Sequence, residues 1–213
     1  MNEITIALAK GRLASDTIAI LEKCGVDCSE LKESSRKLIY YDRQNGYRFL
    51  LVKPSDVPVY VEHGVADIGV AGKDTLLEIN APLYEMLDLG LGKCRLCVCG
   101  FPKGPERAVT TAHLRVATKY PYITREFYAQ RGENVEIIKL NGSIEIAPLL
   151  GLSDVIVDIV ESGRTLKENG LDVLEEVCQC SARVVVNRVS LKTKGEKIQA
   201  LIDAMREERR RVE

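Results

Sequence analysis

The sequence lacks an excess of charge of either sign, which limits the partners that its surface as a whole could attract. Its 213 residues include 30 lysines and arginines against 31 aspartates and glutamates, a formal net charge of -1. Proteins that bind nucleic acid or anionic membranes usually carry a clear basic excess. The balance argues against both partners, and any anion-binding site must therefore be local.

The chain also lacks a long apolar run. None of its hydrophobic stretches approaches the roughly 20 residues that a membrane-spanning helix needs. The amino terminus, Met1-Asn2-Glu3 followed by Ile4-Thr5-Ile6, has neither the basic residues nor the hydrophobic stretch of a secretory signal peptide. We therefore expect a cytoplasmic protein that does not act at a membrane.

A paired set of cysteines is missing too. There are seven cysteines, and an odd number in a protein that is not exported favours reduced thiols over a disulfide framework. The segments around Cys97 and Cys178 could form a zinc site if they met. However, their Cys-x-Cys spacing is not the usual spacing of paired zinc ligands, and their apolar surroundings are typical of cysteines that act as small hydrophobic residues. We expect no structural metal.

What the sequence does contain is an alternation of short apolar strands with helical segments, uninterrupted by internal repeats or low-complexity linkers. This alternation is typical of an α/β protein with largely parallel sheets, and Asn45-Gly46 predicts a hairpin. Strands are expected at residues 4–9, 37–42, 47–52, 66–70, 115–119, 135–140 and 155–160, with a long extended stretch over 173–186. Helices are expected from Ser15 to Cys24, near 55–58, over 74–78, from Pro121 to Gly132, from Ser143, over 165–169 and over 195–211.

Residues 155–166 combine a buried strand with a turn that is rich in hydroxyl groups. The strand is apolar except for one carboxylate, Asp158, and an acid within a buried strand needs a reason. Ser162, Gly163 and Thr165 then supply two hydroxyls and an unhindered backbone position where a short helix can begin. Free N–H groups and the positive end of the helix dipole gather at such a start. The pattern predicts a phosphate site beside an acid.

The wider segment resembles the signature of the ATP phosphoribosyltransferases, the enzymes that open histidine biosynthesis. Ten constrained positions match in register: Glu145, Gly151, Ser153, Ile156, Asp158, Ile159, Ser162, Gly163, Thr165 and Leu166. Residues 7–13 are likewise similar to the family's amino-terminal Ala-x-x-Lys-Gly-Arg-Leu. The resemblance implies an enzyme that joins N1 of the adenine of ATP to C1 of 5-phosphoribosyl 1-pyrophosphate and releases pyrophosphate.

The resemblance also implies a fold, because periodicity alone does not divide these elements into domains. The family is similar to the two-lobed, type II periplasmic binding proteins, which are α/β proteins with a central cleft where ligands bind. Residues 1–98 and 182–213 would form the first lobe. Residues 99–181 would form the second, which carries the phosphoribosyl pyrophosphate loop.

The expected catalytic residues are Asp158, Glu145 and Arg12. Displacement at C1 develops positive charge on the ribose and negative charge on the leaving group, so positioning and electrostatics matter more than a nucleophile. The resemblance implies that the two acids accept hydrogen bonds from the ribose hydroxyls and that Arg12 binds pyrophosphate. The ligands expected for 5-phosphoribosyl 1-pyrophosphate are Lys10, Gly11, Arg12, Lys53, Asp154, Asp158, Glu161, Ser162, Gly163, Arg164 and Thr165.

Some of these assignments have plain alternatives. Asp154 could instead cap the exposed start of its strand, and Lys10-Gly11-Arg12 taken alone is common surface sequence. Lys53 stands where many relatives are expected to have arginine, and lysine keeps the charge but loses the bidentate fork. Magnesium is expected with the pyrophosphate, because this ion keeps waters and takes substrate oxygens as ligands. No metal cage made of protein residues is visible.

For ATP, the resemblance points to Asp67, Gly72, Arg95 and Tyr120. Asp67 could receive the exocyclic amine of adenine, and the glycines around it would let a flat base lie close. A local acceptor in a tight helix-to-strand turn is the alternative for Asp67. Arg95 and Tyr120 match family positions near the site, as does the rest of residues 118–121, although Tyr120 could simply pack between the lobes.

The family resemblance extends to assembly, since the chain stops at Glu213 just past its last expected helix, as in the short form of the family. This form implies a homodimer that joins a regulatory subunit related to histidyl-tRNA synthetase in a hetero-octamer. No interface residue can be read from the sequence.

Two other functions compete. Phosphoribosyltransferases of the Rossmann-like type usually have two adjacent acids before their Thr-Gly-Gly-Thr loop, whereas Asp158 is followed by isoleucine. A non-catalytic solute-binding module could use the same scaffold, because fold does not fix function. Such a module would carry an export signal and would not need Lys10, Arg12 and Asp158.

Overall fold

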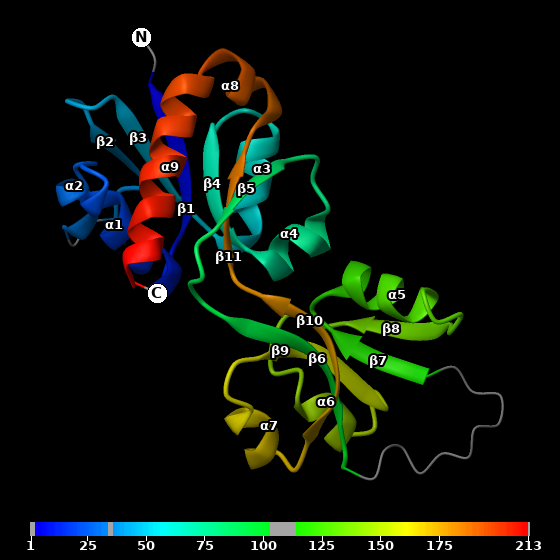
Figure 1. The fold of residues 1–213 in the computed structure, drawn as a ribbon. Helices are drawn as coiled ribbons and strands as arrows, with labels where there is room; N and C mark the ends of the chain where they lie inside the picture. Colours follow the sequence, from blue (N-terminus) through cyan, green and yellow to red (C-terminus); the bar gives the residue numbers. More distant parts are fainter. Residues whose placement is uncertain (1–2, 34–35, 103–113, 213) are drawn as a thin grey trace. The chain divides into compact units, whose positions relative to one another are not determined.

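The structure, a computed structural model, describes residues 3–33, 36–102 and 114–212 (Figure 1). It divides into two compact units, Met1–Gly92 with Ser181–Glu213 and Lys93–Cys180. The first crossing between the units falls earlier than the expected one at residues 98 and 99. The reason is that β6 (Cys94–Gly100) pairs along its length with strands of the second unit.

A six-stranded sheet with the order β2-β3-β1-β4-β11-β5 forms the centre of the first unit. Its strands are β1 (Ile4–Ala9), β2 (Ile39–Asp42), β3 (Tyr47–Val52), β4 (Ile68–Gly72), β5 (Tyr84–Asp88) and β11 (Ala182–Val186). β1 runs parallel to both β3 and β4, while β2 and β3 form the antiparallel hairpin expected around Asn45-Gly46. β11 is antiparallel to β4 and β5.

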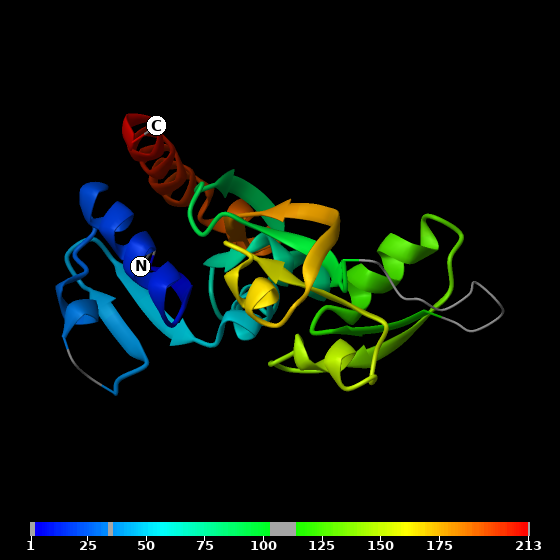
Figure 2. The ribbon, with the colours of Figure 1, turned by 90° about the horizontal axis from the view of Figure 1, so that it is seen from below.

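Helices cover both faces of this sheet, and the alternation of side chains along β1 shows how. Ile4, Ile6 and Leu8 enter one core with α1 (Arg12–Lys23) and α9 (Gly195–Val212), which lie side by side in Figures 1 and 2. Ala7 and Ala9 face the other core, with α3 (Val57–Glu62) and α4 (Lys73–Ile79). The remaining helices of this unit are α2 (Ser29–Lys32), η1 (Pro54–Asp56) and α8 (Arg188–Thr193).

The close approach of α3 to β4 depends on Gly69. A Cβ placed there would lie 2.7 Å from Val61 Cγ2 and 2.8 Å from Val57 Cγ1. Both valines are fully buried and stiff at χ1, so they have little freedom to move aside. We expect Gly69→Ala to lower the free energy of unfolding by about 1–3 kcal/mol, measured by thermal or denaturant unfolding. Gly142→Ala is the control, because a Cβ at Gly142 meets nothing within 4 Å; equal stability of the two variants would contradict the prediction.

The second unit is built on a five-stranded sheet with the order β10-β6-β9-β7-β8. Besides β6, its strands are β7 (Leu114–Thr118), β8 (Val135–Lys139), β9 (Val155–Val160) and β10 (Asp172–Cys180). β9 is parallel to β7 and antiparallel to β6. α6 (Ile146–Leu149) and α7 (Arg164–Glu168) contribute to the core on one face of this sheet, whereas α5 (Pro121–Ala129) packs on β8.

Further details differ from the expectations drawn from the sequence. The extended stretch over residues 173–186 is two strands, β10 and β11, which belong to different sheets. α1 begins at Arg12 after Gly11, whose φ of 113° places the turn before the expected cap, Ser15. Ser143 does not cap α6, because its φ is 50° and the helix begins only at Ile146.

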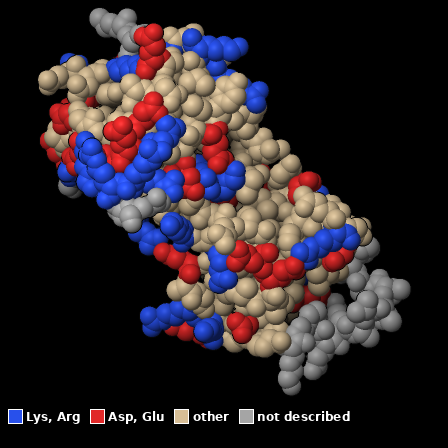
Figure 3. Space-filling model, in the orientation of Figure 1, with Lys and Arg blue, Asp and Glu red and all other residues tan. Residues whose placement is uncertain are grey.

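The surface is mixed in charge. Figure 3 shows basic and acidic side chains interspersed over the visible face, in keeping with the net charge of -1. Among the helices that the structure describes, none is both long enough and apolar enough to span a bilayer.

Candidate active site

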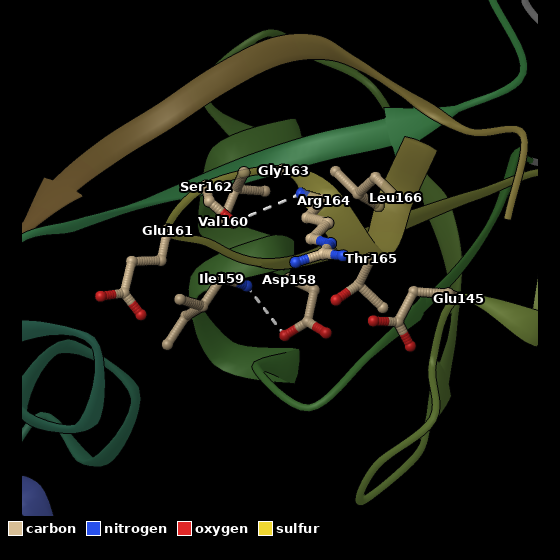
Figure 4. A pocket seen from close by; sticks show the side chains of 10 residues that line it. All are labelled: Glu145, Asp158, Ile159, Val160, Glu161, Ser162, Gly163, Arg164, Thr165 and Leu166. Carbon is tan, nitrogen blue, oxygen red and sulfur yellow. Dashed lines mark hydrogen bonds between the residues drawn. The ribbon is translucent and has the colours of Figure 1, made fainter. Parts of the chain in front are cut away.

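A pocket of about 270 Å³ opens at the carboxyl end of β9, within the second unit. Its lining consists of Glu145, Asp158, Ile159, Val160, Glu161, Ser162, Gly163, Arg164, Thr165 and Leu166. These residues come from the end of β9, the turn after it, α7 and the segment just before α6. The structure thus brings Glu145, which lies 13 residues before Asp158 in the sequence, into the same pocket as Asp158 and the hydroxyl-rich turn (Figure 4).

Asp158 faces the pocket because of the alternation along its strand. Ile156 and Val160, two residues before and after it, both enter the core shared with α6 and α7. Asp158 therefore points to the same side of the sheet, toward the elements that carry Glu145 and Thr165. In Figure 4 its carboxylate lies beside the Thr165 hydroxyl and the Glu145 carboxylate, while Glu161 points elsewhere.

The environment of Asp158 disfavours the ionised form of its side chain. Burial raises the pKa of this carboxyl above its ordinary value, and the negative charge of Glu145 adds to the increase. Two features oppose the shift, the Ile159 N–H, which donates to Asp158 Oδ1 at 2.8 Å, and the positive charge of Lys119. A half-buried acid next to a second acid, at the rim of a pocket, is the kind of group that active sites use.

The turn after β9 depends on a glycine at one position. Gly163 adopts φ 73°, a left-handed conformation that other residues enter only at a cost, and it directly precedes α7. A left-handed residue within a turn lets successive backbone N–H groups converge on an anion. Because α7 has only five residues, the turn rather than a long helix dipole must provide most of the attraction.

Two side chains of the turn interact locally. Ser162 Oγ accepts a hydrogen bond of 3.4 Å from Arg164 N, and Arg164 Nε lies 3.0 Å from Glu168 Oε1 one helical turn further. Both partners of this ion pair are largely exposed, so it contributes little to stability. The guanidinium of Arg164 is therefore available to a ligand in the pocket at small cost.

In the first unit, the expected pyrophosphate residues gather at one edge of the sheet. Lys10-Gly11-Arg12 follows β1 and Lys53 follows the neighbouring parallel strand β3, while Lys10 N donates to Val52 O at 3.0 Å. The three cationic side chains are exposed. Carboxyl ends of adjacent parallel strands are where α/β proteins commonly bind ligands. Gly72 ends β4, the strand on the other side of β1.

Asp154, expected as a substrate ligand, does not line this pocket, and its carboxylate is bonded elsewhere. It precedes β9 at the amino end of the strand, roughly 13 Å along an extended chain from Asp158. Its Oδ2 accepts from Arg115 N at 2.9 Å, and its Oδ1 from Arg115 Nη2 at 2.9 Å. Asp154 thus fixes the start of β9 against β7, close to the alternative role considered for it.

Asp67 is also not free to bind adenine, because its carboxylate is buried and occupied. Only 4% of the residue is exposed. Its Oδ2 accepts from Thr5 N at 2.8 Å and its Oδ1 from Ser190 Oγ at 2.6 Å, while Lys194 Nζ lies 2.8 Å from Oδ2. Asp67 thus ties β1, α8 and the start of α9 together, which agrees with the alternative role of a local acceptor.

Two other residues expected to bind ATP, Arg95 and Tyr120, differ in their exposure to solvent. Arg95 is exposed, and its Nη1 lies 3.3 Å from Glu176 Oε2 across the β6–β10 pair. Tyr120, just before α5, is only 5% exposed, which leaves little of its ring for stacking on a base. Neither residue lines the pocket at the end of β9.

The cysteines are free thiols at all seven positions. Cys97 and Cys99 are fully buried within β6, where burial raises the pKa of both thiols, that of Cys99 to about 12. These two thiols are therefore neutral and pack in the core. Within residues 3–33, 36–102 and 114–212, no group of three or more histidine, cysteine or acidic side chains is arranged to hold a metal ion.

Comparisons with known proteins agree with the signature. The family model described as ATP phosphoribosyltransferase (HisG) matches residues 53–207. ATP phosphoribosyltransferases of Ruminiclostridium cellulolyticum and Bacillus mycoides are 57% and 53% identical to this chain, with 98% of each protein and of this chain covered.

The solved ATP phosphoribosyltransferase (HisG:HisZ) complex from Thermotoga maritima contains a chain that is 37% identical. It superposes with a TM-score of 0.84 over 98% of this chain and 99% of that one. This match confirms the two-lobed α/β fold of the periplasmic-binding-protein type that was expected from the sequence. The chain belongs to the ATP phosphoribosyltransferase family.

Proposed function

We propose that this protein catalyses the first step of histidine biosynthesis, the transfer of the phosphoribosyl group from 5-phosphoribosyl 1-pyrophosphate to N1 of ATP. The observation that supports the reaction at this site is the pocket at the end of β9, where two carboxylates stand beside a hydroxyl-bearing, left-handed turn. The acids suit a ribose and the turn suits its 5-phosphate. The family membership of the chain supports the same reaction.

In the proposed reaction, Asp158 accepts a hydrogen bond from a ribose hydroxyl. It also stabilises the positive charge that develops on the ring as pyrophosphate leaves. Its carboxylate is half buried, so this interaction is screened less than it would be in water. Glu145, also half-buried, would contribute in the same way from the segment before α6. No side chain needs to act as a nucleophile, because N1 of adenine attacks C1 directly.

The turn would hold the 5-phosphate through backbone N–H groups and the hydroxyls of Ser162 and Thr165. Lys10, Arg12 and Lys53 of the first unit would bind the pyrophosphate, with Gly11 allowing close approach of the backbone. Arg12 and Lys53 contribute long, exposed cationic side chains, which is suited to binding a group that must be released. We propose these roles on the charge and strand-end positions of the residues.

Removing the Thr165 hydroxyl should chiefly weaken binding of the phosphoribosyl donor. We expect Thr165→Ala to raise the KM for 5-phosphoribosyl 1-pyrophosphate about tenfold or more, the effect of one lost hydrogen bond to a charged group. The kcat should change less, because the phosphate is held equally before and during the reaction. Steady-state kinetics test this, with Thr165→Ser expected to restore affinity and Thr193→Ala, on the exposed face of α8, as the control. An unchanged KM in Thr165→Ala would remove this hydroxyl from the site.

Magnesium would accompany the pyrophosphate group of the donor as part of the substrate. The carboxylate pair of the pocket, Asp158 and Glu145, offers oxygen ligands, but the described residues contain no three-ligand cluster that would hold the ion by itself. When bound, the ion would neutralise charge on the leaving group. The magnesium concentration that activity requires should therefore be the one that saturates the donor with magnesium, rather than one that saturates a site on the protein.

We also propose that the chain assembles with a regulatory subunit. The structural relative from Thermotoga maritima comes from a HisG:HisZ complex, and its chain and this one align almost end to end. By analogy, a partner related to histidyl-tRNA synthetase would join a homodimer of this chain in a hetero-octamer. Gel filtration and light scattering of the two proteins, alone and mixed, test this; a chain that stays monomeric and is histidine-inhibited by itself would contradict it.

The decisive experiment for the reaction is adenine ultraviolet absorbance during incubation with ATP, 5-phosphoribosyl 1-pyrophosphate and magnesium. Alkylation at N1 changes the adenine chromophore, so turnover gives an absorbance change that depends on all three components. The assay should be run with and without the partner subunit. If purified protein bound a metabolite but never consumed the donor under either condition, a non-catalytic binding role would replace the proposed one.

A further inference from the structure

We propose that Thr118 is a positioning residue of this active site, because its side-chain hydroxyl fixes the peptide unit that leads into Asp158. The inference rests on the function proposed above and adds a residue to it. Thr118 is the last residue of β7 and is fully buried. It does not line the pocket at the end of β9, so it acts through the backbone of that strand and not by contact with the substrate.

Thr118 stands where the pairing between β7 and β9 ends. In the parallel register of these strands the last pair is Thr118 with Val157, so Asp158 is the first residue of β9 beyond that register. On the other side of β9, Asp158 pairs with Cys97 of β6. The attachment of β9 to β7 just before the catalytic acid therefore depends on Thr118.

The hydroxyl of Thr118 uses all of its hydrogen-bonding capacity. Its Oγ1 donates to Val157 O at 2.7 Å and accepts from Tyr120 N at 2.8 Å. Thr124 Oγ1 donates to the same oxygen at 3.4 Å. A carbonyl oxygen can only accept and an amide N–H can only donate, so the two short bonds have fixed directions. The O–H and both lone pairs of Thr118 are thus occupied.

The bond to Val157 O orients the main chain at Asp158. The peptide unit between these two residues is planar, so a bond to its oxygen fixes the plane that ends at Asp158 Cα. Thr118 is a firm anchor, because its own carbonyl accepts from Leu140 N at 3.0 Å. Ile159 N then donates to Asp158 Oδ1 at 2.8 Å and orients the carboxylate itself. The direction in which this carboxylate enters the pocket depends on both bonds.

Loss of the Thr118 hydroxyl should therefore let the Asp158 carboxylate move away from the charge that develops on the ribose. A displacement of about 1 Å at a reacting centre can lower the rate about a hundredfold. One lost hydrogen bond within an otherwise intact sheet should move the carboxylate by less, and we expect kcat to fall about tenfold. The KM for the donor should change less, because the charge of Asp158 is needed mainly in the transition state.

The test compares Thr118→Val with Thr118→Ser in the absorbance assay, with the partner subunit present. Valine keeps the β-branched shape but has no hydroxyl, so it should lower kcat about tenfold while the KM for 5-phosphoribosyl 1-pyrophosphate changes by less than about threefold. Serine keeps the hydroxyl and should restore kcat, although the methyl-sized gap that it leaves in the core should lower the melting temperature. A loss of stability alone would not restore turnover in the serine variant.

Thr124→Val is the matched control. Thr124 is a second fully buried threonine, and its hydroxyl donates to Thr118, but its removal leaves the bond between Thr118 Oγ1 and Val157 O in place. Its kcat should stay within about twofold of that of the unaltered protein. The control thus separates the loss of a buried hydroxyl from the loss of the bond that holds β9.

A double-mutant cycle with Asp158→Asn tests whether Thr118 acts through this carboxylate. If it does, adding Thr118→Val to the Asp158→Asn variant should lower kcat by less than about twofold, since the charge to be positioned is already gone. A further tenfold loss in that background would mean that Thr118 acts on another part of the site, and it would overturn the inference.

The outcomes separate this inference from the proposed function. If the unaltered protein and its partner show no turnover, the function fails and the role of Thr118 fails with it. If they are active and Thr118→Val keeps the kcat of the control, or Thr118→Ser loses as much as Thr118→Val, only the role of Thr118 fails. Should Thr118→Val not fold, Thr118→Ala takes its place, because alanine and serine differ only in the hydroxyl. Slower turnover of the alanine variant than of the serine variant supports the proposal, and equal turnover overturns it.

Discussion

Replacing Asp158 by asparagine should lower kcat by about a hundredfold to a thousandfold while the protein remains folded. The amide keeps the shape of the side chain and can still accept the hydrogen bond from Ile159 N, observed at 2.8 Å. It cannot carry the negative charge that the ribose requires as pyrophosphate leaves. Because that charge is needed mainly in the transition state, kcat should fall much more than the affinity for the donor.

Asp172→Asn is the matched control for this experiment. Asp172 makes the same local contact, accepting from Val173 N at 3.0 Å, but it is exposed on β10 and does not line the pocket. Its variant should therefore keep full activity. Equal activity of Asp158→Asn and Asp172→Asn in the absorbance assay would remove Asp158 from the mechanism.

The stability of the Asp158→Asn variant should also differ from that of an ordinary core mutant. Burial and Glu145 raise the folded-state pKa of Asp158 above its ordinary value, so the folded protein binds a proton more readily than the unfolded chain does. Stability contributed by this group therefore falls as pH rises from the ordinary pKa through the raised one. At neutral pH the ionised carboxylate destabilises the fold, and its replacement should leave thermal stability unchanged or slightly higher. A carboxylate that lowers stability at neutral pH is consistent with the catalytic role proposed for Asp158.

Local patterns in the sequence predicted the elements around the pocket because those elements depend on neighbouring residues. The apolar run that forms β9, the turn at Gly163 and the Asn45-Gly46 hairpin each lie within a few residues of the signal that predicts them. The resemblance to the family added Glu145, which the structure brings to the same pocket from outside that run. The fold and the position of the turn after β9 could accordingly be predicted from the sequence.

What the sequence could not supply was pairing between distant segments. The separation of β10 from β11 at Ser181 has no glycine or proline to mark it, and β5 (Tyr84–Asp88) is too polar to stand out as a strand. Asp154 and Asp158 look alike in sequence, and only the direction of β9 shows that they lie at opposite ends of it. The start of α8 was detectable, because Asn187 caps it by accepting from Val189 N and Ser190 N, both at 2.9 Å.

Asp67 offers the second large effect, this time on stability. Asp67→Asn should lower the free energy of unfolding by about 3 kcal/mol, because it leaves Lys194 without its charged partner and places an amide NH₂ among hydrogen-bond donors. Thr5 N, Ser190 Oγ and Lys194 Nζ all donate to this carboxylate, so one of them must then lose its acceptor. The corresponding decrease in melting temperature is about 6–12 °C for a domain of this size.

Far-ultraviolet circular dichroism suits the measurement, because the chain has no tryptophan to report unfolding by fluorescence. Asp203→Asn is the control, since Asp203 forms its ion pair on the exposed side of α9 and should change stability by less than about 0.5 kcal/mol. The KM for ATP of the folded Asp67→Asn variant should stay close to that of the unaltered protein, because the carboxylate is buried and its oxygens are already bonded. A variant with normal stability and a KM for ATP raised tenfold would instead restore Asp67 to the adenine site. The two measurements together therefore distinguish an internal tie of the first unit from a substrate ligand.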